Sequence, residues 1–166
     1  QSTLSALLLG ELALEAGFPA GAINVISGSG TQIGAALAAH PKVDKVSFTG
    51  STAVGRSILE AAKSDFRRVS LELGGKSPAI VFADADLASA LPSTVWSIFY
   101  SAGQSCDARS RILVQRPIYE SYLEGFAERA GRIRVGDPLD PKTHVGSLIS
   151  GEHRASVEGY VADGLA

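Results

Sequence analysis

The hydrophobic and polar positions of this chain switch repeatedly between the spacing of strands and the spacing of helices. Short apolar runs predict strands over 23–26, 45–48, 67–73, 77–82 and 110–115. Helical spacing predicts helices over 4–16, from the glycine loop to about residue 39, and over 51–63, 86–102, 118–133 and the last residues. This alternation is typical of an α/β protein with a parallel sheet.

Three helices carry more detailed predictions. The first has leucines on several faces, so we expect it to be buried on most of them. Asp84 or Asp86 is expected to cap the helix that leads towards residue 102. Pro92 would cost about 3 kcal/mol inside that helix, which predicts a kink there or a helix that begins near Leu91. Pro117 is expected at an early position of the helix over 118–133.

Composition excludes several classes of function. The chain has 166 residues, a net charge of -2, 45% hydrophobic residues and a single cysteine. Without a basic stripe, nucleic acid is not expected as a partner. The apolar stretches are shorter than the roughly 18 residues of a membrane span, and we expect no export signal. One cysteine makes no internal disulfide, which fits a cytoplasmic protein.

The two ends suggest an internal piece of a longer protein. The chain begins at Gln1 without Met and reaches a helical pattern almost at once. Its last residues again follow a helical pattern. The first seventy residues also predict too few strands for a complete doubly wound sheet, so we expect further strands upstream.

The stretch "VSFTGSTAVG" combines a strand end with a glycine turn and a helix start. Gly50 permits a tight turn, and Ser51 or Thr52 can cap the helix that follows. The free backbone N–H groups at such a helix start favour binding of a phosphate group. By itself the stretch is more simply an ordinary strand-to-helix turn, and the same holds for "GSGTQIG", which lacks the full dinucleotide-binding spacing.

The stretch "LELGGKSPAIVF" places an acidic residue in an apolar run. Glu72 lies between leucines, next to the bend that Gly74 and Gly75 allow. Partial desolvation would raise the pKa of such a carboxylate towards that of a general base. The alternative is a glutamate that faces solvent or pairs with Lys76 or Arg68.

The only cysteine, Cys106, follows a helix that is expected to close at Gly103. A thiol in a glycine-containing loop can reach a cleft, and its thiolate attacks carbonyl carbon. The alternative is a buried structural cysteine. His40, His144 and His153 show no spacing that indicates a Cys-His pair or a metal site, so we expect no metal.

Taken together, "FTGSTAVG", "LELGGKSPAIVF" and "GQSC" ahead of "SRILVQ" resemble the NAD(P)-dependent aldehyde dehydrogenase superfamily. The resemblance covers essentially the whole chain. It implies a Rossmann-like, parallel-sheet dinucleotide-binding portion followed by the start of an α/β catalytic domain. Residues 1–70 would be the C-terminal part of the NAD(P)-binding domain, and residues 71–166 the N-terminal part of the catalytic domain.

The resemblance also implies roles for individual residues. Cys106 would be the nucleophile and Glu72 the general base in oxidation of an aldehyde to a carboxylic acid. The implied contacts to NAD or NADP are Gly30, Gly34, Phe48, Gly50, Ser51, Val54 and Leu73. The full-length protein would be a homo-oligomer, either a dimer or a tetramer.

Two alternatives remain open. In a CoA-acylating semialdehyde dehydrogenase, coenzyme A instead of water would take the thioester, and the presence of Glu72 favours water. A non-catalytic nucleotide-binding relic would keep the fold without chemistry, and the retained Cys106 argues against it.

Asp107 departs from the family, which more often has a small or hydroxyl residue there, and we expect its carboxylate to point away from the thiol. We also expect the chain to be inactive in isolation.

Overall fold

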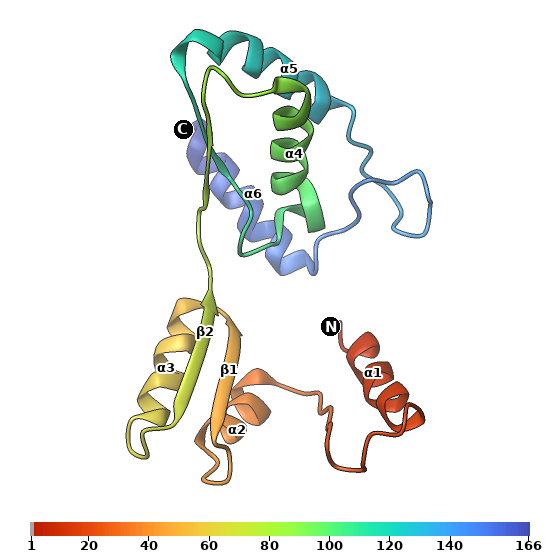
Figure 1. Ribbon diagram of the computed structural model, residues 1–166, viewed down its shortest axis with the longest axis vertical. Helices are drawn as coiled ribbons and strands as arrows, with labels where there is room; N and C mark the ends of the chain where they lie inside the picture. Colours follow the sequence, from red (N-terminus) through yellow and green to blue (C-terminus); the bar gives the residue numbers. More distant parts are fainter. Residues whose placement is uncertain (1) are drawn as a thin grey trace. The chain divides into compact units, whose positions relative to one another are not determined.

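Two pairs of parallel strands, each joined through a helix, organise this protein. Figure 1 labels the first pair, β1 and β2. The structure is a computed structural model that describes residues 2–166. The chain divides into two compact units, one that ends at Leu73 and one that begins at Gly74. Because a tight hairpin cannot join parallel strands, each pair needs a crossover segment, and here that segment is a helix. The expected α/β class with parallel strands is confirmed.

The first unit is built around the strands β1 (Lys45–Gly50) and β2 (Arg68–Leu73), which are linked by the helix α3 (Thr52–Ala62). Ile58 and Ala62 form the buried side of α3. A π-helical turn, η1 (Gly30–Gly34), leads into the short helix α2 (Ala35–Ala39), which packs on α3. The expected end of this segment at about residue 39 is confirmed, since His40 already has an extended backbone.

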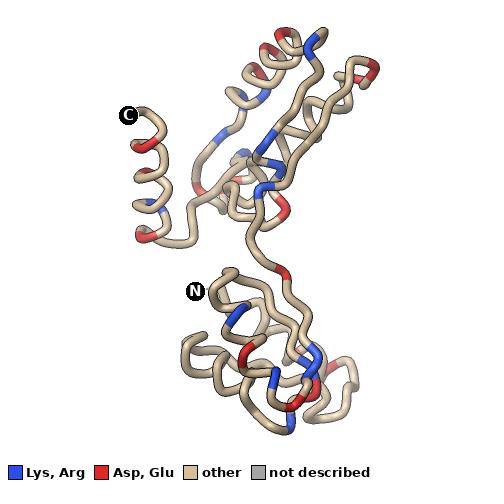
Figure 2. The backbone as a smooth tube through the Cα atoms, turned by 90° about the vertical axis from the view of Figure 1, so that its left-hand side faces the viewer, with Lys and Arg blue, Asp and Glu red and all other residues tan. Residues whose placement is uncertain are grey.

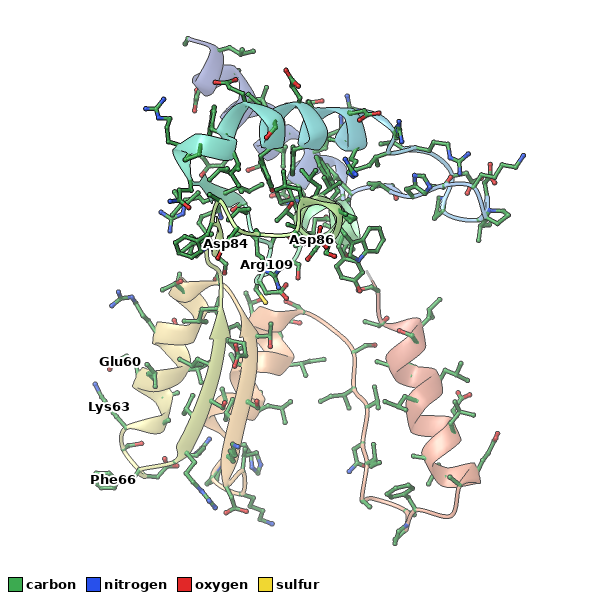
Figure 3. The ribbon with its side chains drawn as sticks, turned by 45° about the horizontal axis from the view of Figure 1, so that its top comes forward. Glu60, Lys63, Phe66, Asp84, Asp86 and Arg109 are labelled. Atoms are coloured by element: carbon green, nitrogen blue, oxygen red, sulfur yellow. The ribbon has the colours of Figure 1, made fainter. Side chains whose placement is uncertain are left out.

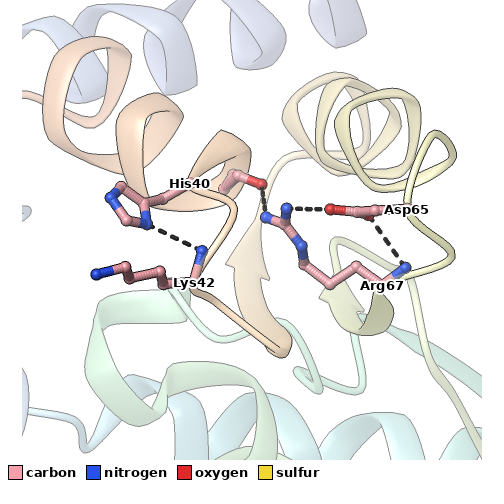
Figure 4. A network of polar contacts seen from close by, with 5 residues as sticks. His40, Lys42, Asp65 and Arg67 are labelled. Carbon is pink, nitrogen blue, oxygen red and sulfur yellow. Dashed lines mark hydrogen bonds and ion pairs between the residues drawn. The ribbon is translucent and has the colours of Figure 1, made fainter.

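A buried arginine ties α2 to the turn between α3 and β2 (Figure 4). The Arg67 side chain is only 4% exposed, donates to the carbonyl of Ala38 and pairs with Asp65. The hydrogen bond from Arg67 lowers the pKa of Asp65 below its usual value. Between them, Phe66 has a left-handed backbone and is 93% exposed at the outer tip of the turn (Figure 3).

The second unit repeats the same connection. Its strands β3 (Pro78–Val81) and β4 (Arg111–Val114) are parallel neighbours, linked through the helix α4 (Leu87–Phe99). Asp86 caps α4, since its carboxylate accepts from the backbone N–H of Ala88 at 3.0 Å (Figure 3). A short helical turn, η3 (Arg116–Ile118), contains Pro117 and starts α5 (Tyr119–Gly131), as the sequence predicts.

The core of the second unit is formed where α4 and α5 cover the strand β3. Val81, Leu91 and Tyr122 are buried together, and Phe126 packs against them. The Tyr122 hydroxyl donates to the Thr94 hydroxyl oxygen at 2.6 Å, so the one buried polar side chain of the core is hydrogen-bonded. Thr94 in turn donates to the carbonyl of Ala90 at 2.9 Å.

Acidic and basic residues are interspersed along α5 and α6 (Gly151–Leu165), as Figure 2 shows. Arg132 pairs with Glu128 on α5, and Arg154 pairs with Glu158 at 2.7 Å on α6. Such exposed pairs one helical turn apart contribute little stability, and every residue of α6 is exposed. No helix within residues 2–166 combines the length and hydropathy that crossing a membrane requires.

Two predicted features of the first unit are wrong. Residues 23–26 form no strand, because this stretch has no paired strand beside it and strands are stabilised by their neighbours. The helix α1 (Leu4–Glu15) is not buried on most faces: only Ala13 is buried, and Leu4 is 80% exposed. Most of its leucines are exposed because no other described element of the unit covers them.

In the second unit, α4 begins at Leu87, so of the two expectations for Pro92 the helix start near Leu91 is wrong, and the kink stays a prediction. Asp86 supplies the cap, and Pro92 lies inside the helix. The strand β2 continues to Leu73, and the compact units also separate there, three residues beyond the predicted boundary at 70/71. The roles of the two units as cofactor and catalytic portions remain a prediction.

Replacing Tyr122 with Phe should lower the free energy of unfolding by about 1 kcal/mol, because the buried Thr94 oxygen loses its donor. The matched control is Tyr119→Phe, which removes the same atom from a ring that is 43% exposed. Urea unfolding of the full-length polypeptide would measure both variants. Equal losses for the two variants would contradict a specific role for the buried hydrogen bond.

Candidate active site

The carboxyl ends of β1 and β2 bring four of the predicted site residues to one edge of a sheet. These residues are Gly50, Ser51, Glu72 and Leu73. In the parallel register Thr49 lies opposite Glu72, and Gly50 lies opposite Leu73. Ser51 follows Gly50 directly as the first residue beyond the strand. The carboxyl edge of a parallel sheet is where ligands bind in open α/β folds, so this edge is the candidate site of the first unit.

The turn from β1 into α3 has the geometry that its sequence predicts. Ser51 has an extended backbone, and its hydroxyl accepts from the backbone N–H of Val54 at 3.3 Å. This cap settles the choice between Ser51 and Thr52. The Phe48 ring lies against Gly50, so a Cβ at this position would force the ring to move.

A second glycine of this motif sets how closely α3 approaches the sheet. Gly55 is buried, and a Cβ there would lie 2.9 Å from a methyl carbon of Leu73. Since real contacts of a Cβ are longer than this, any larger residue must displace the Leu73 side chain. Gly55 therefore helps to position the end of β2, a role that sequence analysis did not assign to it.

The glycines of the first glycine loop, Gly30 and Gly34, differ from Gly50 and Gly55 because an added Cβ would have no close neighbour there. A Cβ at Gly30 or Gly34 would meet nothing within 4 Å, and neither residue has a positive φ. The fold of this unit therefore gives no packing or conformational reason for glycine at these two positions. Both lie in η1, and the Ser29 and Thr31 hydroxyls beside them share a hydrogen bond of 2.7 Å.

Glu72 is exposed in this chain, which corrects the expectation of partial desolvation. Alternate residues of a strand face opposite sides of a sheet, and Glu72 is on the exposed side of β2. Among the described residues of its own unit, Glu72 forms no ion pair, so the suggested pairing with Arg68 is absent there. The alternative of a glutamate that faces solvent agrees with this exposure.

Cys106 is an exposed, free thiol on the connection between α4 and β4, so the alternative of a buried structural cysteine is wrong for this chain. Its loop begins with a sharp turn. Ser101, Ala102 and Gly103 have φ values of 52°, 58° and 75°, all in the left-handed region. For Ser101 and Ala102 this conformation costs about 1 to 3 kcal/mol each, a strain typical of functional sites.

Several backbone contacts hold the cysteine loop in place. Arg109 donates its backbone N–H to the carbonyl of Ser97 at 3.4 Å, which ties the loop to α4. A Cβ on Gly75 would lie 3.6 Å from the Cys106 carbonyl oxygen, so the start of the second unit runs beside the loop. Gln104, which the sequence pattern does not single out beyond "GQSC", makes two side-chain hydrogen bonds. Its amide nitrogen donates to the carbonyl of Ser101, and its amide oxygen accepts from the backbone N–H of Ile149.

The carboxylate of Asp107, the residue after Cys106, is hydrogen-bonded to the side chain of Ser105. It accepts a hydrogen bond from the Ser105 hydroxyl, which lowers the pKa of Asp107 below its usual value. The residue's own backbone N–H and the positive charge of Arg109 lower that pKa further. Asp107 therefore stays ionised throughout the pH range in which a thiol titrates.

The three histidines take no part in a metal cluster. His144 accepts from the backbone N–H of Arg134 at 3.1 Å, and His40 accepts from that of Lys42 at 3.2 Å (Figure 4). His153 lies on the exposed helix α6. Within residues 2–166, no group of three or more His, Cys, Asp or Glu side chains could hold a metal ion.

Comparison with known proteins assigns the chain to a family. The model of the aldehyde dehydrogenase family matches residues 1–166. This chain belongs to the aldehyde dehydrogenase family. It is 51% identical over 164 residues to the 5-carboxymethyl-2-hydroxymuconate semialdehyde dehydrogenase of Escherichia coli, covering 99% of this chain and 34% of that protein. It is also 48% identical to retinal dehydrogenase 2 of Mus musculus, covering all of this chain and 32% of that protein.

Solved structures support the same assignment to the aldehyde dehydrogenase fold. PnpE, solved in complex with nicotinamide adenine dinucleotide, has a TM-score of 0.92 at 46% identity and matches 97% of this chain. An NADP-dependent enzyme of E. coli has a TM-score of 0.93 at 43% identity and matches 99% of this chain. The chain spans about a third of the length of these relatives.

Replacing Asp107 with Asn should leave the pH dependence of Cys106 alkylation unchanged, because the Asp107 carboxylate is expected to point away from the thiol and already accepts a hydrogen bond from the Ser105 hydroxyl. Iodoacetamide reaction rates of the full-length polypeptide across pH would test this. Asp84→Asn, elsewhere in the second unit, is the control for loss of one negative charge. A thiol pKa that falls only in the Asp107 variant would show that the two groups interact.

Proposed function

We propose that the protein containing this chain oxidises an aldehyde to a carboxylic acid with NAD or NADP, using Cys106 as nucleophile and Glu72 as general base. The register of β1 and β2 is the strongest structural support. It lines up Glu72 and Leu73 with Thr49 and Gly50 at the carboxyl edge of the sheet, directly before the Ser51 cap. Membership of the aldehyde dehydrogenase family supports the same chemistry.

The first unit has features that fit a dinucleotide. Gly30 and Gly34 have open space where a Cβ would stand, so a ligand can approach their backbone closely. The start of α3 favours a negatively charged phosphate. Phe48, Gly50, Ser51, Val54 and Leu73 complete the proposed contacts. When bound, the nicotinamide accepts the hydride that leaves the substrate carbon.

Cys106 would form the covalent intermediate with the substrate, and Glu72 would activate the water that hydrolyses it. The Cys106 thiolate adds to the aldehyde carbon, and the backbone N–H of Cys106 can stabilise the resulting oxyanion. Loss of hydride leaves a thioester on the sulfur. Glu72 then takes a proton from water, the hydroxide attacks the thioester, and the carboxylic acid leaves as the thiolate is restored. The exposure of Cys106 supports access of a substrate to the sulfur.

Both cofactors remain candidates because the similar structures include an NAD complex and an NADP-dependent enzyme. The relatives also differ in the aldehydes that their names state, a semialdehyde in one and retinal in another. The proposed substrate is therefore an aldehyde without further definition. We further propose a cytoplasmic homo-oligomer, which the lone unpaired cysteine and the exposed leucines of α1 support.

Replacing Cys106 with Ser should abolish NAD(P)H formation in the full-length polypeptide, because a serine hydroxyl is a far weaker nucleophile than a thiolate. The measurement is absorbance of the reduced cofactor with a panel of aldehydes. Cofactor binding to the variant, followed by fluorescence, is the control for folding. Measurable cofactor binding but no turnover by the wild type with any aldehyde would instead favour the non-catalytic relic.

Replacing Glu72 with Gln should preserve a first burst of about one reduced cofactor per site and suppress the steady rate, because thioester hydrolysis loses its base. Stopped-flow absorbance would separate the two phases. Adding coenzyme A to this variant distinguishes the acylating alternative, in which a thiol acceptor would restore turnover. A steady rate equal to that of the wild type would contradict the role of Glu72.

A further inference from the structure

The side chain of Gln104 connects two segments of the second unit, two residues before Cys106. Its amide nitrogen donates to the carbonyl of Ser101 at 3.0 Å. Its amide oxygen accepts from the backbone N–H of Ile149 at 3.0 Å, across 45 residues of sequence. One side chain therefore fixes the cysteine loop both to the turn that precedes it and to the segment that precedes α6.

Gln104 is hydrogen-bonded to the strained turn at Ser101 and Ala102. Ser101 and Ala102 hold left-handed backbone angles that side chains disfavour, so this turn needs contacts that stabilise it. The carbonyl of Ser101 accepts twice from Gln104, from the side chain at 3.0 Å and from the backbone N–H at 3.2 Å. The hydrogen bonds of Gln104 are thus concentrated on the residue where the left-handed turn begins.

We propose that Gln104 is a positioning residue that holds the Cys106 loop in its reactive arrangement. The proposal rests on the assignment of Cys106 as the nucleophile. An amide suits the role because it carries a donor and an acceptor on one group, and this position uses both. A carboxylate would keep only the acceptor, and an aliphatic side chain would keep neither.

Gln115 offers a matched control in the same unit. Its side-chain oxygen accepts from the backbone N–H of Ala83 at 2.7 Å, across 32 residues of sequence. It follows the far end of β4, whereas Cys106 precedes the start of that strand. Gln115→Leu therefore removes a comparable long-range hydrogen bond without touching the cysteine loop.

The first test compares wild type, Gln104→Leu, Gln104→Glu and Gln115→Leu in the full-length polypeptide. We expect Gln104→Leu to lower kcat by about 100-fold, the scale that a small misplacement of a reacting group produces, with KM for the cofactor unchanged. Gln104→Glu should fall between this variant and the wild type, because it retains the acceptor for Ile149. Gln115→Leu should keep the kcat of the wild type.

Three results would overturn the proposal: a wild-type kcat in Gln104→Leu, an equal loss in Gln115→Leu, or a loss confined to KM for the cofactor. If Gln104→Leu does not fold, the comparison of Gln104→Glu with Gln115→Leu decides in the same way.

Hydrogen–deuterium exchange separates failure of this proposal from failure of the proposed function. Gln104→Leu should exchange faster than the wild type over residues 101–110 and at the Ile149 amide, while Gln115→Leu should not. If the wild type oxidises no aldehyde, the proposed function fails, and faster exchange still supports Gln104 as the residue that holds this loop. Unchanged exchange in Gln104→Leu overturns the positioning role whatever the activity.

Discussion

The parallel pairing of β1 with β2 is the constraint on which the first unit depends. Two neighbouring strands that run in the same direction need a crossover, and α3 provides it. Gly55 allows that helix to pack closely on the sheet, because any side chain there would displace the Leu73 side chain. The same pairing brings both strand ends to one edge. The turn into α3 and the end of β2 are therefore neighbours, although about twenty residues of sequence separate them.

The second unit uses the same connection but presents its chemistry at the opposite end of the helix. In the first unit Gly50 and Ser51 lie where β1 leads into α3, and Glu72 and Leu73 lie at the end of the neighbouring strand β2. Cys106 instead lies where α4 returns to β4, and a left-handed turn supported by Gln104 shapes that return. Only two residues separate Glu72 from Gly75, and Gly75 in turn lies beside the Cys106 carbonyl.

Apolar surface is distributed unevenly between the elements. The core of the second unit is compact around Val81, Leu91 and Tyr122, whereas α1 leaves most of its leucines exposed. The chain spans about a third of the length of its relatives. An amphipathic or apolar element is stable only when something covers its apolar face, so α1 carries the pattern of a buried helix without the neighbours that would bury it.

The sequence alone determined the alternation of strands and helices, the βα turn at Gly50 and Ser51, and the residues whose types suit the chemistry. These depend on local spacing, glycine freedom and capping, which neighbouring residues specify. Tertiary structure alone decided which predicted strands found partners: the strand predicted over 45–48 did, and the one over 23–26 did not. It also decided the exposure of Glu72, the left-handed turn at Ser101 and the bond from Gln104 to Ile149. The bond from Gln104 to Ile149 joins residues far apart in the chain, which a local sequence pattern does not reveal.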